Sequence, residues 1–210
     1  MVIKAFRPAV LLMLAGLILG ACTSLKQAEG PEQKLFSDRI AVLSQLQDWS
    51  LSGRMAVKHT DGGGQGSLNW SQSGDTTDIV LSGPLGIGTM NIHWVPEEVV
   101  VNGSNLDIEH RYSGEDAATE FLTSQLGWEF PAKSIRYWLL GIPDPAFAYD
   151  TTYSDTGELV SITQLDWEVR YSRFTEQEGY LLPAKMEVEK SGLRLRLVVD
   201  EWNPADVAAP

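Results

Sequence analysis

The only cysteine of the chain, Cys22, stands where its thiol could accept a lipid. It follows an apolar run over residues 11–19 and two small residues, and basic residues precede the run. The leader therefore has the three parts of a cleavable secretory signal. Residues 19–22, Leu-Gly-Ala-Cys, also fit the bacterial lipobox, in which the thiol is acylated and the cysteine becomes the first mature residue. We predict a signal peptide over residues 1–21 and lipid attachment at Cys22.

An ordinary cleaved signal, or a short membrane anchor with an incidental cysteine, is the alternative for this leader. The apolar run is too short to span a bilayer comfortably, since about 20 apolar residues are needed. One acyl chain such as palmitate binds membranes only marginally, at about 0.8 kcal/mol per buried methylene, whereas two or three chains give a lasting anchor. In lipobox proteins of Gram-negative bacteria, a residue other than Asp after the cysteine, here Thr23, implies sorting to the outer membrane.

The chain is strongly acidic, with 16 Lys and Arg against 28 Asp and Glu and a formal net charge of −12. Removal of the predicted signal peptide takes away two basic residues and no acidic one, which leaves −14. This charge argues against nucleic acid as a partner, because such binding depends largely on Lys and Arg contacts with phosphate. Anionic membrane surfaces would also repel the chain, so membrane contact should be apolar or through the lipid.

Chemistry of the enzymatic kind has little support in the sequence. His59, His93 and His110 are far apart and lack any zinc-type spacing. A nucleophile elbow, a P-loop and a dinucleotide fingerprint are absent. A carboxylate pair for glycoside hydrolysis stays open, because such pairs are recognised by geometry rather than by spacing. Most carboxylates should be solvated surface groups, and we expect no enzyme activity, no metal and no cofactor.

The mature chain is predicted to form one domain behind a tether. Residues 22–36 are polar, include Gly30 and Pro31, and are expected to be a flexible tether. The domain spans residues 37–203, and residues 204–210 form a tail. With its thiol taken by lipid, the chain can form no internal disulfide, so its stability rests on burial. A short helix is expected near the start, and its apolar face contains Leu35, Ile40, Leu43 and Leu46.

Alternation of apolar and polar residues dominates the domain and is typical of strands with one buried face. The apolar positions are Trp49, Leu51, Met55, Val57, Leu68, Trp70, Ile79, Leu81, Met90, Ile92, Trp94, Trp167, Val169, Tyr171, Met186, Val188, Leu193, Leu195 and Leu197. A further short strand is expected over residues 99–101. Turns at residues 62–64 and 73–75 connect consecutive antiparallel strands. We therefore predict a mainly β (α+β) fold built on one large curved antiparallel sheet.

Two helices are predicted within this series of strands. Ser113 and Asp116 resemble a capping box for a helix that ends at Gly127. The second helix begins at Pro131 and ends at Gly141. Their apolar faces contain Ala117, Phe121, Leu122 and Leu126 in the first and Ile135, Trp138 and Leu139 in the second. We expect both helices to cover the apolar face of the sheet.

The segment 82–88, Ser-Gly-Pro-Leu-Gly-Ile-Gly, carries two large aliphatic side chains in a turn rich in glycine. It does not suit phosphate, because no lysine and no helix N-terminus follow it. Leu85 and Ile87 could fold back onto the core. Alternatively they form an exposed apolar hook, and exposed hydrophobic groups of this kind mark contact with lipid or a partner.

The seven tryptophans all lie between residues 49 and 202, and most are expected to pack in the core. A curved sheet lined by large apolar side chains could still leave a cavity that accepts acyl chains. The candidate lining residues, chosen for apolar bulk on the predicted inner face of the sheet or its cover, are Trp70, Met90, Ile92, Trp94 and Trp138.

Several segments in a fixed order carry a family resemblance. They are the lipobox, Gly53-Arg54 in the first strand, Trp70, the loop Pro84-Leu85-Gly86, residues 134–143, the strand 167–171, Leu182-Pro183 and Trp202. Together they resemble the LolB family of outer-membrane lipoprotein receptors. The most specific part is residues 134–143, SIRYWLLGIP, and the resemblance extends from the leader to about Trp202.

The resemblance implies an open, incomplete antiparallel β-barrel with helices as a cover over an apolar cavity. It further implies a receptor that accepts acylated lipoproteins from the soluble periplasmic carrier LolA and inserts them into the outer membrane of a Gram-negative bacterium. Leu85 matches the family's protruding loop leucine, which is associated with membrane insertion, and Ile87 adds a second aliphatic. The expected partners are a LolA-type carrier, the acyl chains of cargo lipoproteins and outer-membrane phospholipid, with the protein a monomer on the periplasmic face.

Two other functions stay open from the residues alone. One is a structural or lipid-storing lipoprotein that binds acyl chains without passing them on. The other is a periplasm-facing hydrolase whose carboxylates cannot be placed from the sequence. Binding without transfer would select the first, and turnover of a glycan or an ester would select the second.

Overall fold

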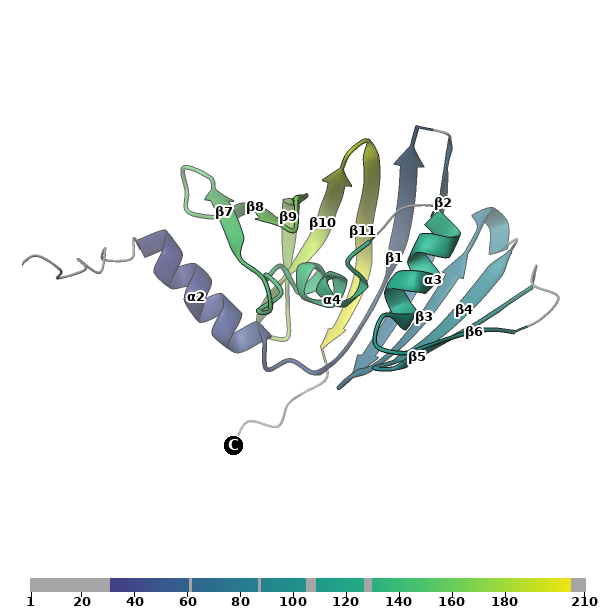
Figure 1. The fold of residues 1–210 in the computed structure, drawn as a ribbon. Coiled ribbons are helices and arrows are strands. Elements are labelled where there is room, and N and C mark those ends of the chain that lie inside the picture. Colours follow the sequence, from purple (N-terminus) through teal and green to yellow (C-terminus); the bar gives the residue numbers. More distant parts are fainter. Residues whose placement is uncertain (1–30, 61, 87, 105–108, 127–129, 205–210) are drawn as a thin grey trace, which may run out of the picture. The chain divides into compact units, whose positions relative to one another are not determined.

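The computed structural model describes residues 31–60, 62–86, 88–104, 109–126 and 130–204. In these residues the chain forms one antiparallel sheet with helices packed on it (Figure 1). The strands are β1 (Asp48–His59), β2 (Gly62–Ser73), β3 (Thr76–Ser82), β4 (Thr89–Val95), β5 (Glu98–Gly103), β6 (His110–Ser113), β7 (Tyr149–Tyr153), β8 (Leu159–Gln164), β9 (Trp167–Gln177), β10 (Tyr180–Lys190) and β11 (Leu193–Pro204).

The sheet has eleven strands in the order β6-β5-β4-β3-β2-β1-β11-β10-β9-β8-β7. Consecutive strands pair with each other, except β6 and β7, and the first strand, β1, also pairs with the last, β11, in the middle of the sheet. The edge strands β6 and β7 are not paired with each other, so the sheet is open in the described part of the chain. The predicted single antiparallel sheet, and the open incomplete barrel that the resemblance implied, are confirmed.

Tight turns at glycine connect many of the strands. Gly74, between β2 and β3, has φ of 54°, and Gly192, between β10 and β11, has φ of 86°. Glycine adopts these left-handed angles without the steric penalty that other residues meet. Because these turns are short, they fix the register of the strands that they connect, and Ser73 pairs with Thr76 across the first of them. In the middle of the sheet, Leu51 of β1 pairs with both Trp70 of β2 and Trp202 of β11.

The helices are α2 (Pro31–Leu43), α3 (Ala117–Leu126) and α4 (Ala132–Leu140), with a single 3₁₀ turn, η1 (Pro84–Gly86). α3 contacts β5 and β6, and α4 contacts β10, on the same face of the sheet (Figure 1). We call this face the inner face. α4 ends at Gly141, whose φ of 74° lets its N–H donate to the Trp138 carbonyl at 3.0 Å. Among the described residues, none of these helices combines the length and apolar character needed to cross a bilayer.

Three local expectations need correction. Ser113 is the last residue of β6 and not a helix cap, because α3 begins only at Ala117, whose N–H donates to the Gly114 carbonyl. The segment expected as tether up to residue 36 is helical from Pro31. The strands β7 and β8 form an edge of the sheet that the alternation did not identify.

One half of the inner face is densely filled. Between α4 and strands β8–β10, the side chains with no exposed surface are those of Trp138, Ile162, Val169, Leu182 and Val188. The Phe130 ring meets the Trp167 ring edge to face, with centroids 4.9 Å apart. Aromatic pairs in this geometry add stability beyond the area that they bury.

A buried polar network fixes α4 on this half. The Trp138 indole N–H and the Asp144 backbone N–H both donate to Oε1 of Gln164, at 2.9 and 3.0 Å. Gln164 Nε2 donates in turn to the carbonyl oxygens of Asp144 and Phe147. The Ser134 hydroxyl donates to the Asp144 carboxylate at 2.8 Å. Gln164 is 1 % exposed and both atoms of its amide are hydrogen-bonded. Removing this side chain would leave several buried groups without a hydrogen-bond partner.

Arg39 of α2 fixes the other end of α4. Its guanidinium donates to the carbonyls of Leu140, Gly141 and Leu181, at 2.7, 3.1 and 2.6 Å, and lies over the Phe174 ring. A cation is favourable at the C-terminal end of a helix, where the carbonyl dipoles converge. Burial lowers the pKa of Arg39 to about 10, so the group is still charged at neutral pH.

Candidate acyl-binding cavity

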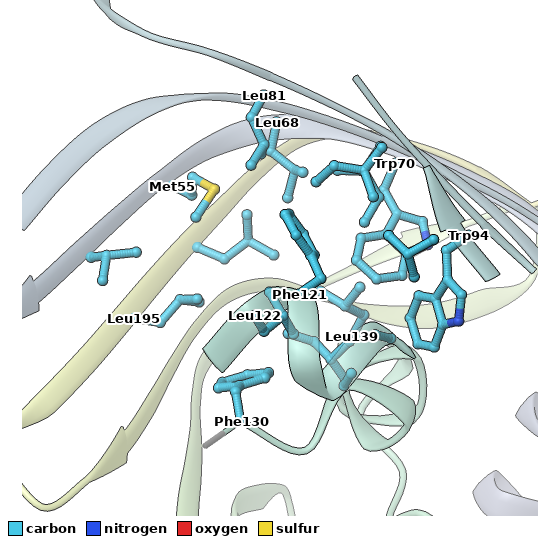
Figure 2. Close-up of a pocket in the computed structure, with 18 residues that line it drawn as sticks. Met55, Leu68, Trp70, Leu81, Trp94, Phe121, Leu122, Phe130, Leu139 and Leu195 are labelled. Carbon is cyan, nitrogen blue, oxygen red and sulfur yellow. The ribbon is translucent and has the colours of Figure 1, made fainter. Parts of the chain in front are cut away.

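The other half of the inner face contains an apolar cavity of about 150 Å³ (Figure 2). It lies between strands β1–β5 and β11 on one side and α3 and α4 on the other. All 18 lining residues are apolar. They are Met55, Val57, Leu68, Trp70, Ile79, Leu81, Ile92, Trp94, Val99, Ala118, Phe121, Leu122, Phe130, Ala132, Ile135, Leu139, Leu195 and Leu197.

The register of the strands determines which residues form the sheet side of this lining. Leu68 pairs with Leu81, and Trp70 pairs with Ile79, which also pairs with Ile92 of β4. Side chains two apart on a strand point to the same face, so these residues form adjacent rows across β2, β3 and β4. The result is a continuous apolar wall.

The helices supply the opposite side of the cavity. Phe121 and Leu122 come from α3, Leu139 comes from α4, and Phe130 lies just before α4 (Figure 2). The same α4 therefore presents Leu139 to the cavity and Trp138 to the filled half. A single helix can do this because successive residues lie about 100° apart around its axis.

The lining restricts what the cavity can do. It contains no carboxylate, imidazole, hydroxyl or amine side chain, so it offers no group for acid–base or nucleophilic chemistry. Within the described residues, no group of three His, Cys, Asp or Glu side chains could hold a metal ion. His93, on β4, contacts Asp78 at 2.7 Å on the exposed surface. Such a cavity suits an apolar ligand.

The structure separates the five residues predicted to line a cavity. Trp70, Ile92 and Trp94 line it together. Met90 lines an adjoining groove instead. Trp138 needs correction: it is 0 % exposed in the filled half and its indole bonds to Gln164, so it does not line the cavity.

The predicted lipid-attachment and insertion residues are placed only in part. Cys22 and Ile87 lie outside the described residues. Leu85 lies in η1, between β3 and β4, where the backbone is described and the side chain is not. The loop is closed at its base because the N–H of Gly83 donates to the Gly88 carbonyl at 3.1 Å. Lipid attachment and membrane insertion stay predictions.

Sequence reasoning missed most of the helix side of the cavity. Phe121, Leu122, Ile135 and Leu139 had been expected on the apolar faces of the covering helices, without a role in a cavity. Their 3.6-residue spacing identifies a buried face, but it does not distinguish close packing from the wall of a cavity. Met55, Ile79 and Leu81 were likewise recognised as inner-face residues only.

The fold and the cavity define a class of protein, namely a single open antiparallel sheet with helices over an apolar interior. Two solved structures share this fold. A DUF1329 family protein from Desulfovibrio piger has a TM-score of 0.53 and 12% identity, covering 84% of this chain and 94% of its own. A LolA superfamily protein from Nitrosomonas europaea has a TM-score of 0.52 and 11% identity, covering 82% of this chain and 94% of its own.

Sequence comparison identifies the family within this class. The family model "Outer membrane lipoprotein LolB" matches residues 47–202. The outer-membrane lipoprotein LolB of Nitrosococcus oceani is 32% identical over 91% of this chain and 95% of its own length. That of Pseudomonas fluorescens is 33% identical over 88% of this chain and 87% of its own. The chain belongs to the LolB family of outer-membrane lipoproteins.

Proposed function

We propose that this protein accepts the acyl chains of lipoproteins in its cavity from a LolA-type periplasmic carrier and inserts these lipoproteins into the outer membrane. Family membership and the shared fold support a role in lipoprotein localisation. The observation that carries the proposal is the cavity, whose entire lining is apolar. In this proposal the protein is not an enzyme, is held on the periplasmic face of the outer membrane by lipid on Cys22, and acts as a monomer.

Transfer in this proposal proceeds downhill, because the sequence carries no nucleotide-binding motif to couple it to an energy source. The cavity must then hold acyl chains more tightly than the carrier does, and the membrane more tightly still. Each tenfold step in affinity corresponds to about 1.4 kcal/mol. Small differences in cavity lining between carrier and receptor are sufficient for such steps, since one buried methylene contributes about 0.8 kcal/mol.

The loop of Leu85 and Ile87 is assigned the insertion step. We expect Leu85→Glu to leave cargo uptake largely intact and to impair delivery, because a charge at the loop penalises entry into the acyl region of the bilayer. Leu181→Glu is the matched control, since Leu181 is a 54 % exposed leucine on β10, away from this loop. Equal losses of uptake and delivery in Leu85→Glu would instead place Leu85 in the core or the cavity.

The acidic surface of the mature chain suggests how the carrier is recruited. A net charge of −14 would attract a basic rim on the carrier and raise the rate of encounter. Salt screens such long-range attraction, so we expect the transfer rate to fall as ionic strength rises. A transfer rate that does not change with ionic strength would contradict this recruitment step.

The experiment that tests the proposed function is a two-step transfer assay. An acylated lipoprotein bound to purified LolA is mixed with residues 22–210 carrying Cys22→Ala, and phospholipid vesicles are added afterwards. Movement of cargo first to this protein and then to vesicles supports the proposal. Cargo that never leaves the carrier contradicts it. Cargo that reaches this protein and stays there would favour the lipid-storing alternative.

A further inference from the structure

A groove of about 380 Å³ adjoins the cavity and lies where β1, β2 and the end of β3 approach the loop before β4. Its lining is completed by Met90, the residue that sequence reasoning had assigned to the cavity. The two hollows share Met55, Val57 and Leu81, so the same side chains form part of both linings. The groove is therefore a continuation of the cavity along the inner face.

The groove exists because the inner-face side chains of β2 become smaller toward the start of the strand. The inner-face positions of this strand, read toward its start, are Trp70, Leu68, Gly66 and Gly64. Across the β1–β2 pair, Gly66 lies opposite Met55 and Gly64 lies opposite Val57. The apolar wall thus loses its side chains at these two positions.

Only one of these two glycines is required by the fold. A Cβ at Gly66 would stand 2.2 Å from the Ser82 carbonyl oxygen, closer than any side chain can approach. A Cβ at Gly64 would meet nothing within 4 Å, and the φ of Gly64 is not in the left-handed region. Glycine within a strand is unfavourable relative to alanine, so Gly64 weakens β2 without any steric need. Its evident consequence is the open space of the groove.

The size of the cavity also favours a continuation. An engineered protein cavity of 150 Å³ accommodates a ligand the size of benzene. The cavity here has the same volume, which leaves most of a long acyl chain outside it. The groove adds room and is less apolar, since His59, Gln65, Ser67 and Ser82 contribute to its lining. This composition suits the end of an acyl chain that is attached to a polar group.

We propose that the glycine-lined groove is the second part of the acyl site. The tail of a long acyl chain lies in the cavity, and its polar-linked end leaves through the groove past Gly64. η1 contacts β2 beside this groove, so the opening lies next to the loop that is assigned to membrane insertion. The inference rests on the proposed function for its ligand, but it assigns a site and an exit route that the apolar cavity alone does not define.

The test measures the binding of fatty acids with 8, 12 and 16 carbons to residues 22–210 carrying Cys22→Ala. Three further variants are compared: Gly64→Trp, Gly64→Ala and Asn69→Trp. Trp at position 64 should fill the groove without clashing with the backbone, whereas Ala should leave it open. Asn69→Trp places the same side chain on the exposed outer face of β2, outside both hollows.

We expect affinity to rise with chain length in the parent protein. Gly64→Trp should keep the affinity for the 8-carbon acid within twofold and lower that for the 16-carbon acid at least tenfold, and the two other variants should match the parent. Unchanged 16-carbon binding in Gly64→Trp, or an equal loss for all lengths, would overturn the proposal. If the parent binds no fatty acid, the proposed function fails as well, whereas failure of the groove alone leaves length-dependent binding intact.

Discussion

The two halves of this sheet both carry apolar inner faces and use them differently. Beneath α4, strands β8–β10 meet the helix in close packing, and Ile162, Val169 and Leu182 have no exposed surface. Beneath α3, strands β1–β5 leave a cavity, and Ile79, Leu81 and Trp94 are only partly buried. The contrast shows that apolar character alone does not determine whether a layer becomes core or binding site.

The attachment of the covering helices differs between the two halves. α4 is fixed by hydrogen bonds from Trp138 and Ser134 at one side and by Arg39 at its C-terminal end. The hydroxyl of Tyr171 adds a further bond to the Trp138 carbonyl at 2.9 Å, and burial raises the pKa of Tyr171, which keeps it a neutral donor. α3 covers the hollow half mainly through apolar contacts, chiefly of Phe121 and Leu122, and one exposed hydrogen bond joins it to β6, between the hydroxyls of Ser124 and Tyr112. In the filled half, α4 is therefore fixed to the sheet, and we regard this half as the scaffold that supports the hollow half.

The largest effect is expected for Trp138→Ala in the filled half. It removes a fully buried indole and one of the two hydrogen bonds to Gln164 Oε1, so we expect a loss of about 3–5 kcal/mol in the free energy of unfolding. Urea titration followed by circular dichroism measures this loss. Trp138→Phe, which keeps a ring but not the donor, should recover part of it. A loss below 1 kcal/mol for Trp138→Ala would show that the filled half is not the scaffold.

Gln164→Leu isolates the polar network from the packing. The substitution keeps a side chain of similar size, but it leaves two buried N–H groups and two carbonyls without their partner. We expect a loss of about 1–3 kcal/mol in the free energy of unfolding. The neighbour Thr163 is exposed on the opposite face of β8, so Thr163→Leu is the control and should change little. Equal effects of the two substitutions would mean that the network does not fix α4.

Trp94→Ala tests the hollow half. Because this indole is only partly buried against the cavity, we expect a smaller loss of stability, about 1–2 kcal/mol. The affinity for a 16-carbon fatty acid should fall further in Trp94→Ala than in Trp138→Ala. Fluorescence competition measures the affinity, and urea titration the stability. A stability loss equal to that of Trp138→Ala would remove the distinction between the two halves.

The smallest effect is expected on the outer face of the sheet, where β10 of the filled half pairs with β11 of the hollow half. There Glu187 accepts a hydrogen bond from Arg196 at 2.8 Å, within a network that also includes Arg170 and Arg194. Because Arg196 is exposed, Arg196→Gln should cost less than about 1 kcal/mol, and salt should remove the difference. Thermal unfolding at low and high salt measures it. A larger, salt-independent loss would extend the scaffold to the outer face.

Most of the sheet could be predicted from the sequence because its strands alternate with period two. The runs through Met55 and Leu195 are of this kind, and short glycine turns imply antiparallel neighbours. β7 was missed because its five residues, Tyr149–Tyr153, form a short edge strand with no fully buried member. The capping box at Ser113 was misplaced because the same Ser pairs with Glu98 at the end of β6, and strand pairing outweighed local capping.

The site was less predictable than the fold. Trp70, Ile92 and Trp94 could be selected because they are large and alternate on inner-facing strands. Trp138 was selected on the same ground, and this prediction was wrong. Its indole donates to Gln164, which lies 26 residues further along the chain, so the pairing is recognisable only in three dimensions. Whether facing apolar residues leave a void depends on how two layers approach each other, which no local pattern encodes.

The most direct test of the two-halves account is photolabelling of the unmodified inner face by a 16-carbon fatty acid that carries a diazirine in its tail. It is applied to residues 22–210 with Cys22→Ala, and labelled peptides are identified by mass spectrometry. We expect label on β3 and α3, at residues such as Ile79, Leu81 and Leu122. Label at Val169 or Ile162, between α4 and strands β8–β10, would contradict the account, because the side chains packed there have no exposed surface.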